Sequence, residues 1–368
     1  MNPDPRGRRS TRTDLALSVS IPGFDPFSRL CILLSTMTDT LFLTSSDVDT
    51  LATPSEYVDA VRDGYRQRGE GAPAQPRSKF LREDPEGMFT AYAAILPDTG
   101  VMGGYMYSAG FGAADAWFMT PLFDAESGAP LALLDGASMN PFKTGAVGAV
   151  GVDELARDDA DTLAIIGSGA QARGQLHATA TVREFTDVRV YSPTPENRAA
   201  FASDFDDALE ADVRAVDSNT AAVTGADVVI TATQASEPVI DGDDLEPGTH
   251  VTAMGQYSPD KRELDAETIA RATYVPDLRE RATMDAGSFI QALEEGVITE
   301  DHVHAELGDV VAGTEPGRTS DDELTVFDSG GTGIETVAAA SLLYERAKEE
   351  GVGQTIEFAP ASEALTGN

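Results

Sequence analysis

Residues 162–179 constrain the fold more than any other segment. The apolar run at 162–166 has the length of a buried strand, and glycines and then a helical pattern follow it directly. Gly167, Gly169 and Ala172 fit the pattern G-x-G-x-x-G/A, which combines a tight turn, close backbone approach to a pyrophosphate, and close packing of the helix on the sheet. The amino end of such a helix offers N–H groups to phosphates. The segment predicts a dinucleotide site; the alternative is a glycine turn that serves packing alone.

Short apolar strands continue to alternate with helical or loop stretches after this segment. They lie at 187–192, 212–217, 227–233, 249–255 and 273–277. This alternation, which ends near Asp309, is typical of a parallel, doubly wound sheet. We therefore predict an α/β fold.

The flanking stretches have a different pattern. After a short strand near Phe42, residues 54–68 predict a helix, and the strand-like runs that follow are separated by turn residues. The segment 124–130 lies between two apolar runs and predicts a hairpin. Residues 334–351 predict a closing helix. The chain thus has a β-rich start, an α/β middle and a helical end.

The first 40 residues differ in charge from the rest. They carry a net charge of +1, and the remaining residues carry −37. We interpret residues 1–40 as an extension outside the fold, with the functional start at Met37. A twin-arginine export signal at Arg8 and Arg9 is the alternative, but Asp14, Pro22, Asp25 and Pro26 interrupt any apolar core segment there.

The acidic excess narrows the possible partners. The 368 residues have a formal net charge of −36 and contain four lysines. This balance is typical of a protein from a salt-loaded, halophilic cytosol, where salt screens the self-repulsion. It argues against nucleic acid and anionic membranes as partners. A binding tail for a basic partner is the alternative, although the acidic residues form no single block.

Metal and disulfide chemistry have little support in the sequence. Cys31 is the one cysteine, so no intramolecular disulfide forms. His302 and His304 lie near acidic residues, but a solvated turn explains them better than a metal site does. We predict no metal.

The end of the second strand of the α/β region bears on the choice of nucleotide. NAD sites usually place a carboxylate there, whereas this chain has Ser192 and Thr194, with Arg198 shortly after. These side chains suit a 2′-phosphate, so we predict NADP, with NAD as the alternative. In the other interpretation, Arg198 merely faces solvent.

Four stretches resemble the ornithine cyclodeaminase/mu-crystallin family. They lie at 122–146, 165–176, 255–265 and 304–335, and the last of them, with PGRTSDDE followed by FDS, is the most distinctive. The resemblance implies a Rossmann domain inserted in a second α+β domain built from both chain ends, which forms a dimer. It implies domains at 41–150 plus 320–360 and at 151–319. It also implies hydride transfer between a nicotinamide and the α-carbon of an amino or imino acid.

The resemblance also assigns roles to single residues. Arg77 matches the family's first carboxylate-binding arginine, with a surface ion pair as the alternative, and Lys143 stands where the second arginine is usual. Thr144 is expected to contact the cofactor. The predicted cofactor contacts in full are Gly167, Gly169, Ala170, Gln171, Ala172, Ser192, Thr194, Arg198, Ala232, Thr233, Gly255, Thr144 and Ser329.

Two positions depart from the family pattern. Tyr105 stands where a lysine is usual, and Tyr257 stands where an aspartate is usual. Two phenols suit neither ammonium binding nor carbonyl polarisation. The sequence leaves three functions open: an imine reductase or amino-acid dehydrogenase in which Tyr105 or Tyr257 donates a proton, an ornithine cyclodeaminase, and a binding protein without catalysis. The carboxylates considered as further site residues are Glu83, Asp115 and Asp124. The expected location is the cytoplasm.

Overall fold

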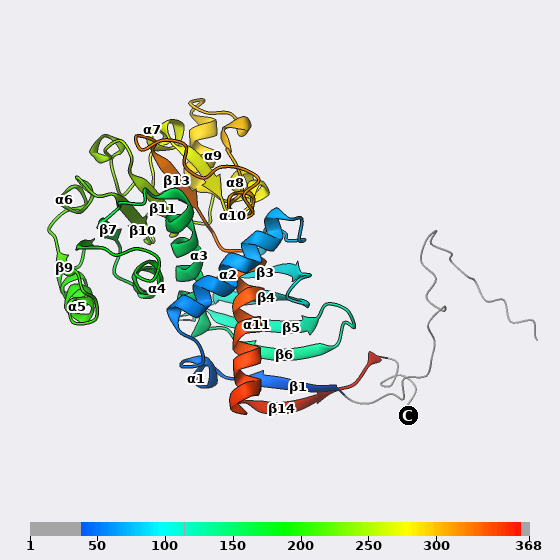
Figure 1. The fold of residues 1–368 in the computed structure, drawn as a ribbon. Helices are drawn as coiled ribbons and strands as arrows, with labels where there is room; N and C mark the ends of the chain where they lie inside the picture. The colour runs from blue at the N-terminus through cyan, green and yellow to red at the C-terminus, as the bar shows by residue number, and fades with distance from the viewer. Residues whose placement is uncertain (1–37, 114, 362–368) are drawn as a thin grey trace, which may run out of the picture. The chain divides into compact units, whose positions relative to one another are not determined.

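Figure 1 shows the chain as a computed structural model that describes residues 38–113 and 115–361. Residues Thr38–Phe358 form one compact unit. Arg8, Arg9 and Cys31 lie outside the described residues. The prediction of an extension over 1–40 is wrong for residues 38–40, because they begin the first strand, β1 (Thr38–Leu43).

The α/β middle forms a seven-stranded parallel sheet in the order β12-β13-β11-β10-β7-β8-β9. Its strands are short, and three of the inner ones are buried at every position, as expected where a sheet is covered on both faces. The predicted fold class is confirmed. The strands are β7 (Thr162–Ile166), β8 (Asp187–Tyr191), β9 (Asp212–Ala215), β10 (Val228–Thr231), β11 (His250–Ala253), β12 (Thr273–Pro276) and β13 (Thr325–Asp328).

The second sheet also has seven strands and is mostly antiparallel, in the order β14-β1-β6-β5-β4-β3-β2. Its edge strand β14 (Gln354–Phe358) pairs with β1, so both ends of the described unit contribute to it. The predicted hairpin at 124–130 joins two of its strands. The remaining strands are β2 (Ser78–Glu83), β3 (Glu86–Leu96), β4 (Val101–Gly110), β5 (Trp117–Asp124) and β6 (Pro130–Asp135).

Two of the long helices begin at side-chain caps. In α2 (Pro54–Gly69), the Thr53 side chain accepts from the Glu56 backbone N–H and the Glu56 side chain accepts from the Thr53 backbone N–H. Thr332 and Glu335 form the same reciprocal pair at the start of α11 (Gly333–Glu350), and the left-handed Gly351 ends that helix. Both helices pack on the antiparallel sheet (Figure 1).

One more long helix and several shorter ones connect the strands. They are α1 (Ser45–Val48), α3 (Met139–Leu155), α4 (Ala170–Thr179), α5 (Pro195–Asp206), α6 (Asn219–Val223), η1 (Gly242–Asp244), α7 (Ala266–Arg271), α8 (Arg279–Met284), α9 (Gly287–Glu294), η2 (Glu300–His302) and α10 (Leu307–Val311). Across 38–113 and 115–361, no helix has the length and apolar character needed to cross a bilayer.

One segment belongs to a different sheet than the sequence predicts. Residues 320–328 were expected in the second domain, yet β13 pairs with β11 and β12 in the parallel sheet. Its four residues are all buried, so the strand completes the parallel core before the chain turns into α11. The other domain limits stay predictions.

Candidate functional site

The glycine-rich loop after β7 has the geometry that its sequence predicts. Gly167 has φ +129°, and a Cβ there would lie 2.4 Å from the carbonyl oxygen of Ala232, so this position requires glycine. Gly169 is the N-cap of α4 and has no side-chain cap, and a Cβ there would meet nothing within 4 Å. The loop therefore leaves open space in front of the amino end of a ten-residue helix.

The other predicted cofactor residues gather at the carboxyl edge of the same parallel sheet. Such an edge is where nucleotides bind in doubly wound folds. Ala170, Gln171 and the buried Ala172 form the first turn of α4; Ser192 and Thr194 follow β8, Ala232 and Thr233 follow β10, Gly255 follows β11, and Ser329 follows β13.

Ser192, Thr194 and Arg198 form a small polar group after β8. The Ser192 hydroxyl lies 2.9 Å from that of Ser168 in the glycine-rich loop. Arg198 donates to the Ser192 carbonyl at 2.9 Å and pairs with Asp217 at 3.0 Å. Arg198 is therefore held against the end of the strand, and the interpretation that it merely faces solvent is wrong.

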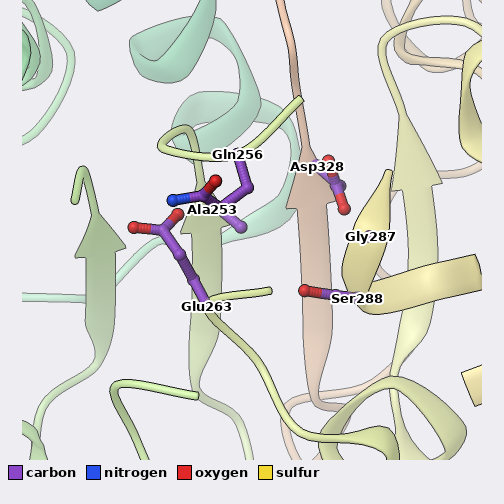
Figure 2. Close-up of a pocket in the computed structure, with 6 residues that line it drawn as sticks. All are labelled: Ala253, Gln256, Glu263, Gly287, Ser288 and Asp328. Carbon is purple, nitrogen blue, oxygen red and sulfur yellow. The ribbon is translucent and has the colours of Figure 1, made fainter. Parts of the chain in front are cut away.

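A buried carboxylate that the sequence did not single out joins two of these strand ends. Glu263 accepts from the backbone N–H groups of Thr233 and Gly255, at 2.7 and 2.8 Å, and from the Thr231 hydroxyl at 2.9 Å. Burial raises the pKa of Glu263, against the effect of these hydrogen bonds. Figure 2 shows Glu263 beside Gln256 at a small polar pocket that Asp328 and Ser288 line from the other side.

Helix α3 carries Lys143 and Thr144 to the nucleotide-binding edge. A Cβ on Gly145 would lie 2.1 Å from the Gly174 carbonyl of α4, so the two helix backbones touch. Gln175 of α4 donates to the Thr144 carbonyl at 2.8 Å. Small residues on both helices were the available sequence signal for this crossing, and the sequence analysis missed it.

Arg77 lies directly before β2 and is 5% exposed. It donates to the Tyr107 hydroxyl at 3.0 Å and to the Gly331 carbonyl at 3.2 Å, and it also donates to the Gly330 carbonyl. Its Nε has no hydrogen-bond partner and lies 3.7 Å from Asp285. The interpretation of Arg77 as a surface ion pair is therefore wrong.

Lys143 is buried beside a carboxylate and an aromatic ring. Its Nζ lies 3.7 Å from Glu335 and 4.8 Å from the centre of the Tyr105 ring. Burial lowers the pKa of Lys143, Glu335 raises it and Arg77 lowers it further. Tyr105 is also buried and donates a long hydrogen bond of 3.4 Å to the Gly136 carbonyl. Burial raises the pKa of Tyr105 far above that of a free phenol.

Tyr257 lies at the surface and contacts Arg77. It is 38% exposed, and its ring centre is 4.6 Å from the Arg77 guanidinium carbon. Lys79 contacts the same ring, with its Nζ 5.5 Å from the ring centre, and pairs with Asp285 at 3.0 Å. Neither Lys79 nor Asp285 was predicted as a site residue, because they are far apart in the sequence and match no motif.

A buried ionic network fixes the loop that follows β13. Arg281 pairs with Asp277, Asp285 and Asp328. Asp277 in turn accepts from the Ser329 hydroxyl at 2.8 Å and from the Gly330 and Gly331 backbone N–H groups at 3.0 and 3.2 Å. The carbonyls that hold Arg77 are thus themselves held in place.

The carboxylates beside Arg77 and Lys143 are Asp285 and Glu335, not the three that the sequence offered. Glu83 and Asp115 are exposed, and Asp124 accepts from Ser127 in the β5–β6 turn. His302 and His304 bond to the backbone carbonyls of Ile269 and Pro316. Outside residues 1–37, 114 and 362–368, no group of three or more metal-ligating side chains forms a candidate metal site.

The glycine-rich loop of the parallel sheet has the form of a dinucleotide site, and the buried Arg77 and Lys143 have the chemistry to bind an anionic small molecule. Residues 38–351 match the ornithine cyclodeaminase/mu-crystallin family. The chain belongs to this family, and the predicted resemblance is confirmed.

Similar proteins carry names that agree with this class. The chain is 39% identical over 238 residues to a Δ1-pyrroline-2-carboxylate reductase of Bacillus cereus, over 64% of this chain and 73% of that protein. The structure of the Thermococcus litoralis Δ1-pyrroline-2-carboxylate reductase with NADH and L-proline has a TM-score of 0.82 and 34% identity, over 86% of this chain and all of that one. An archaeal alanine dehydrogenase dimer with bound NAD has a TM-score of 0.81 and 33% identity, over 87% of this chain and all of that one.

Proposed function

We propose that this protein is an NAD(P)-dependent oxidoreductase that reduces the C=N bond of a small imino acid to the amino acid. The observation that carries this proposal is the pair of hydrogen bonds from Arg77 to the Gly330 and Gly331 carbonyls. These glycines follow Ser329 at the carboxyl end of β13, so a cation suited to a substrate carboxylate is tied to the nucleotide-binding edge. The proposal agrees with the imine-reducing activity named for two of the similar proteins.

The residues of the parallel sheet fit a nicotinamide dinucleotide. The open space at Gly169 and the uncapped amino end of α4 suit the pyrophosphate. The bound cofactor supplies the hydride, and the protein's part is to orient the substrate and exclude water. Ala232, Thr233, Gly255 and Ser329 would hold the rest of the cofactor from the neighbouring strand ends.

NADPH is the proposed form of the cofactor. The end of β8 carries Ser192 and not a carboxylate, and Arg198 is held there by its bond to the Ser192 carbonyl. A guanidinium at this place suits a 2′-phosphate. The similar structures contain NADH or NAD, so NAD is the alternative to test.

Arg77 and Lys143 are the proposed carboxylate-binding cations. A guanidinium can bind a carboxylate through two parallel hydrogen bonds, and a nearby ammonium adds charge. Tyr257 covers one face of the Arg77 guanidinium, so it would border the bound substrate. Tyr105 keeps its proton at neutral pH, because burial raises its pKa, and its ring lies against the Lys143 ammonium.

A binding protein without turnover is the second candidate. Arg77 already has hydrogen bonds to two carbonyls and a hydroxyl, and the Tyr257 ring lies against it. An ornithine cyclodeaminase would release ammonia without net formation of NADH.

We also propose an oligomeric state, a kind of source and a cellular location for this protein. An apolar face that extends over β2, β3, β4 and β5 of the antiparallel sheet supports a homodimer, as in the similar alanine dehydrogenase. Its exposed side chains are Phe80, Phe89, Met106, Trp117 and Met119. The net charge of −36 supports a halophilic source, and the single cysteine supports a cytoplasmic location.

Fluorescence titration with NADPH and NADH in molar KCl tests whether the nucleotides bind. Cyclic imino acids, and mixtures of keto acid and amine, are then added to test for turnover. Oxidation of bound NADPH by an imine supports the reductase. Tight binding without oxidation supports the binding protein, and ammonia from ornithine supports the lyase. If neither nucleotide binds, the dinucleotide site itself is rejected.

A further inference from the structure

Lys79 and Asp285 form a charged pair to which the proposed function gives no role. Lys79 lies on β2, and Asp285 directly follows α8. Their Nζ and Oδ2 atoms are 3.0 Å apart. Asp285 is buried, whereas the Lys79 side chain is 21% exposed. The buried Asp285 carboxylate therefore holds a Lys79 ammonium that is still partly exposed to solvent.

This pair belongs to the same contact cluster as the proposed substrate-binding arginine. Lys79 is two residues from Arg77, so the two side chains share one face of an extended segment. Both contact Asp285 and both lie against the Tyr257 ring. Lys79 Nζ also donates to the Tyr257 carbonyl, two residues after Gly255 at the nucleotide-binding edge.

Four other ionisable groups near this pair are poor proton donors. Arg77 and Arg281 keep their protons in proteins. Tyr105 is buried, and burial raises its pKa. Lys143 is 1% exposed, so it has no ready route for reprotonation from solvent. Lys79 and Tyr257 are both partly exposed and can both release a proton, but Lys79 also has a carboxylate, Asp285, 3.0 Å from its Nζ to hold the proton-bearing atom in place.

We propose that Lys79 is the catalytic proton donor of the imine reduction, and that Asp285 is the residue that positions it; this inference rests on the proposed function. Lys79 transfers one proton from Nζ to the imine nitrogen and becomes a neutral amine. The C=N π bond breaks as the hydride, with its electron pair, forms the new C–H bond. The substrate carbon is reduced and the nicotinamide is oxidised. Water then returns a proton to Lys79.

The surroundings of Lys79 agree with such a donor. Burial lowers the pKa of Lys79 below the ordinary value for lysine, Asp285 raises it, and Arg77 and Arg281 lower it. These groups come from β2, α8 and the segments beside them, and Tyr257 packs against Lys79 from the loop after β11. A donor is active while protonated, so kcat should fall as pH rises through this lowered pKa.

The activity test compares Lys79→Met and Lys79→Arg with the wild type, and uses Lys348→Gln, on the far helix α11, as the matched control. We expect both Lys79 variants to bind NADPH normally and to reduce imines about 10²- to 10⁴-fold more slowly. Arginine keeps the charge but releases no proton, so recovery of activity in Lys79→Arg would overturn the proposal. Wild-type rates in Lys79→Met would overturn it as well.

A second test needs no turnover. The chain has four lysines, Lys79, Lys143, Lys261 and Lys348, so the NMR signals of ¹³C-labelled lysine side chains can be assigned by substitution. We expect the signal lost in Lys79→Met to titrate below the ordinary lysine range, and Asp285→Asn to move it lower still. An ordinary titration of Lys79 would contradict the proposal.

The experiments distinguish failure of the proposed reductase function from failure of the proposed role of Lys79. If the wild-type protein oxidises NADPH with an imine and Lys79→Met does so equally well, the role of Lys79 is rejected and the reductase stands. If the wild type oxidises NADPH with no imine at all, the reductase is rejected, and the role of Lys79 as its proton donor is rejected with it.

Discussion

The nucleotide-binding edge of the parallel sheet and the charged cluster around Arg77 are built by different means. At the first, glycine positions and backbone N–H groups define the site, and few side chains carry charge. At the second, ion pairs join residues that lie up to about two hundred positions apart, such as Lys79 and Asp285. A backbone site is encoded locally, whereas a side-chain site depends on the whole fold.

The largest effect is expected when the arginine at the centre of the charged network is removed. Arg281→Met leaves Asp277, Asp285 and Asp328 without their shared buried partner. Loss of one partner of a buried ion pair costs about 3–5 kcal/mol, so we expect that decrease in the free energy of unfolding. Urea unfolding in molar KCl measures it, with Arg346→Met at the surface as the control. A decrease below 1 kcal/mol would mean that the network is not a structural centre.

Two nearby glycines test whether the backbone alone defines the nucleotide-binding edge. Gly167→Ala forces a Cβ against the Ala232 carbonyl at a positive φ, and we expect it to lose up to about 3 kcal/mol of stability together with nucleotide binding. Gly169→Ala has open space and an ordinary φ, so we expect normal thermal unfolding but weak NADPH binding. Normal nucleotide affinity in Gly169→Ala would show that the cofactor does not approach this backbone.

Much of the parallel sheet and its nucleotide-binding edge could be predicted from the sequence, whereas the charged cluster could not. The G-x-G-x-x-A loop, the strand alternation and the helix at 54–68 are local patterns, and the structure has them where they were expected. Glu263 and Asp285 were not found, because their partners come from distant strands and helices and a single carboxylate has no local signature. β13 was misplaced because its neighbours, a loop and α11, gave no sign of which sheet it joins.

A pH experiment tests how one buried histidine affects the stability of the parallel sheet. Burial lowers the pKa of His250, between Thr252 and Thr325 in the parallel sheet, to about 3. The unfolded chain binds a proton near pH 6.5 and the folded chain does not, so stability is complete above pH 6.5 and falls below it. Between pH 6.5 and 5 we expect a loss of about 2 kcal/mol from this group.

Denaturant unfolding of His250→Gln across that pH range checks the expectation, because this variant should lose less stability on acidification than the wild type. His304→Gln, whose ring contacts only the Pro316 carbonyl among the described hydrogen bonds, is the matched control. Equal pH slopes in the wild type and His250→Gln would rule out this source of acid sensitivity.

The smallest expected effect concerns the choice of nucleotide. Arg198→Ala removes the guanidinium beside Ser192, and we expect NADPH affinity to fall about tenfold, or about 1.4 kcal/mol, while NADH affinity is kept. Fluorescence titration with both nucleotides measures the ratio. An equal loss for NADH and NADPH would assign Arg198 a structural role through Asp217 and remove the argument for NADP.

The most direct test of the account is to follow the hydride itself. The wild-type protein is incubated in molar KCl with an imino acid and with NADPH that carries deuterium at the transferable position, and the amino acid formed is examined by mass spectrometry. The account predicts one deuterium at the α-carbon of the product. Product without deuterium, or no product beside tightly bound NADPH, would contradict it.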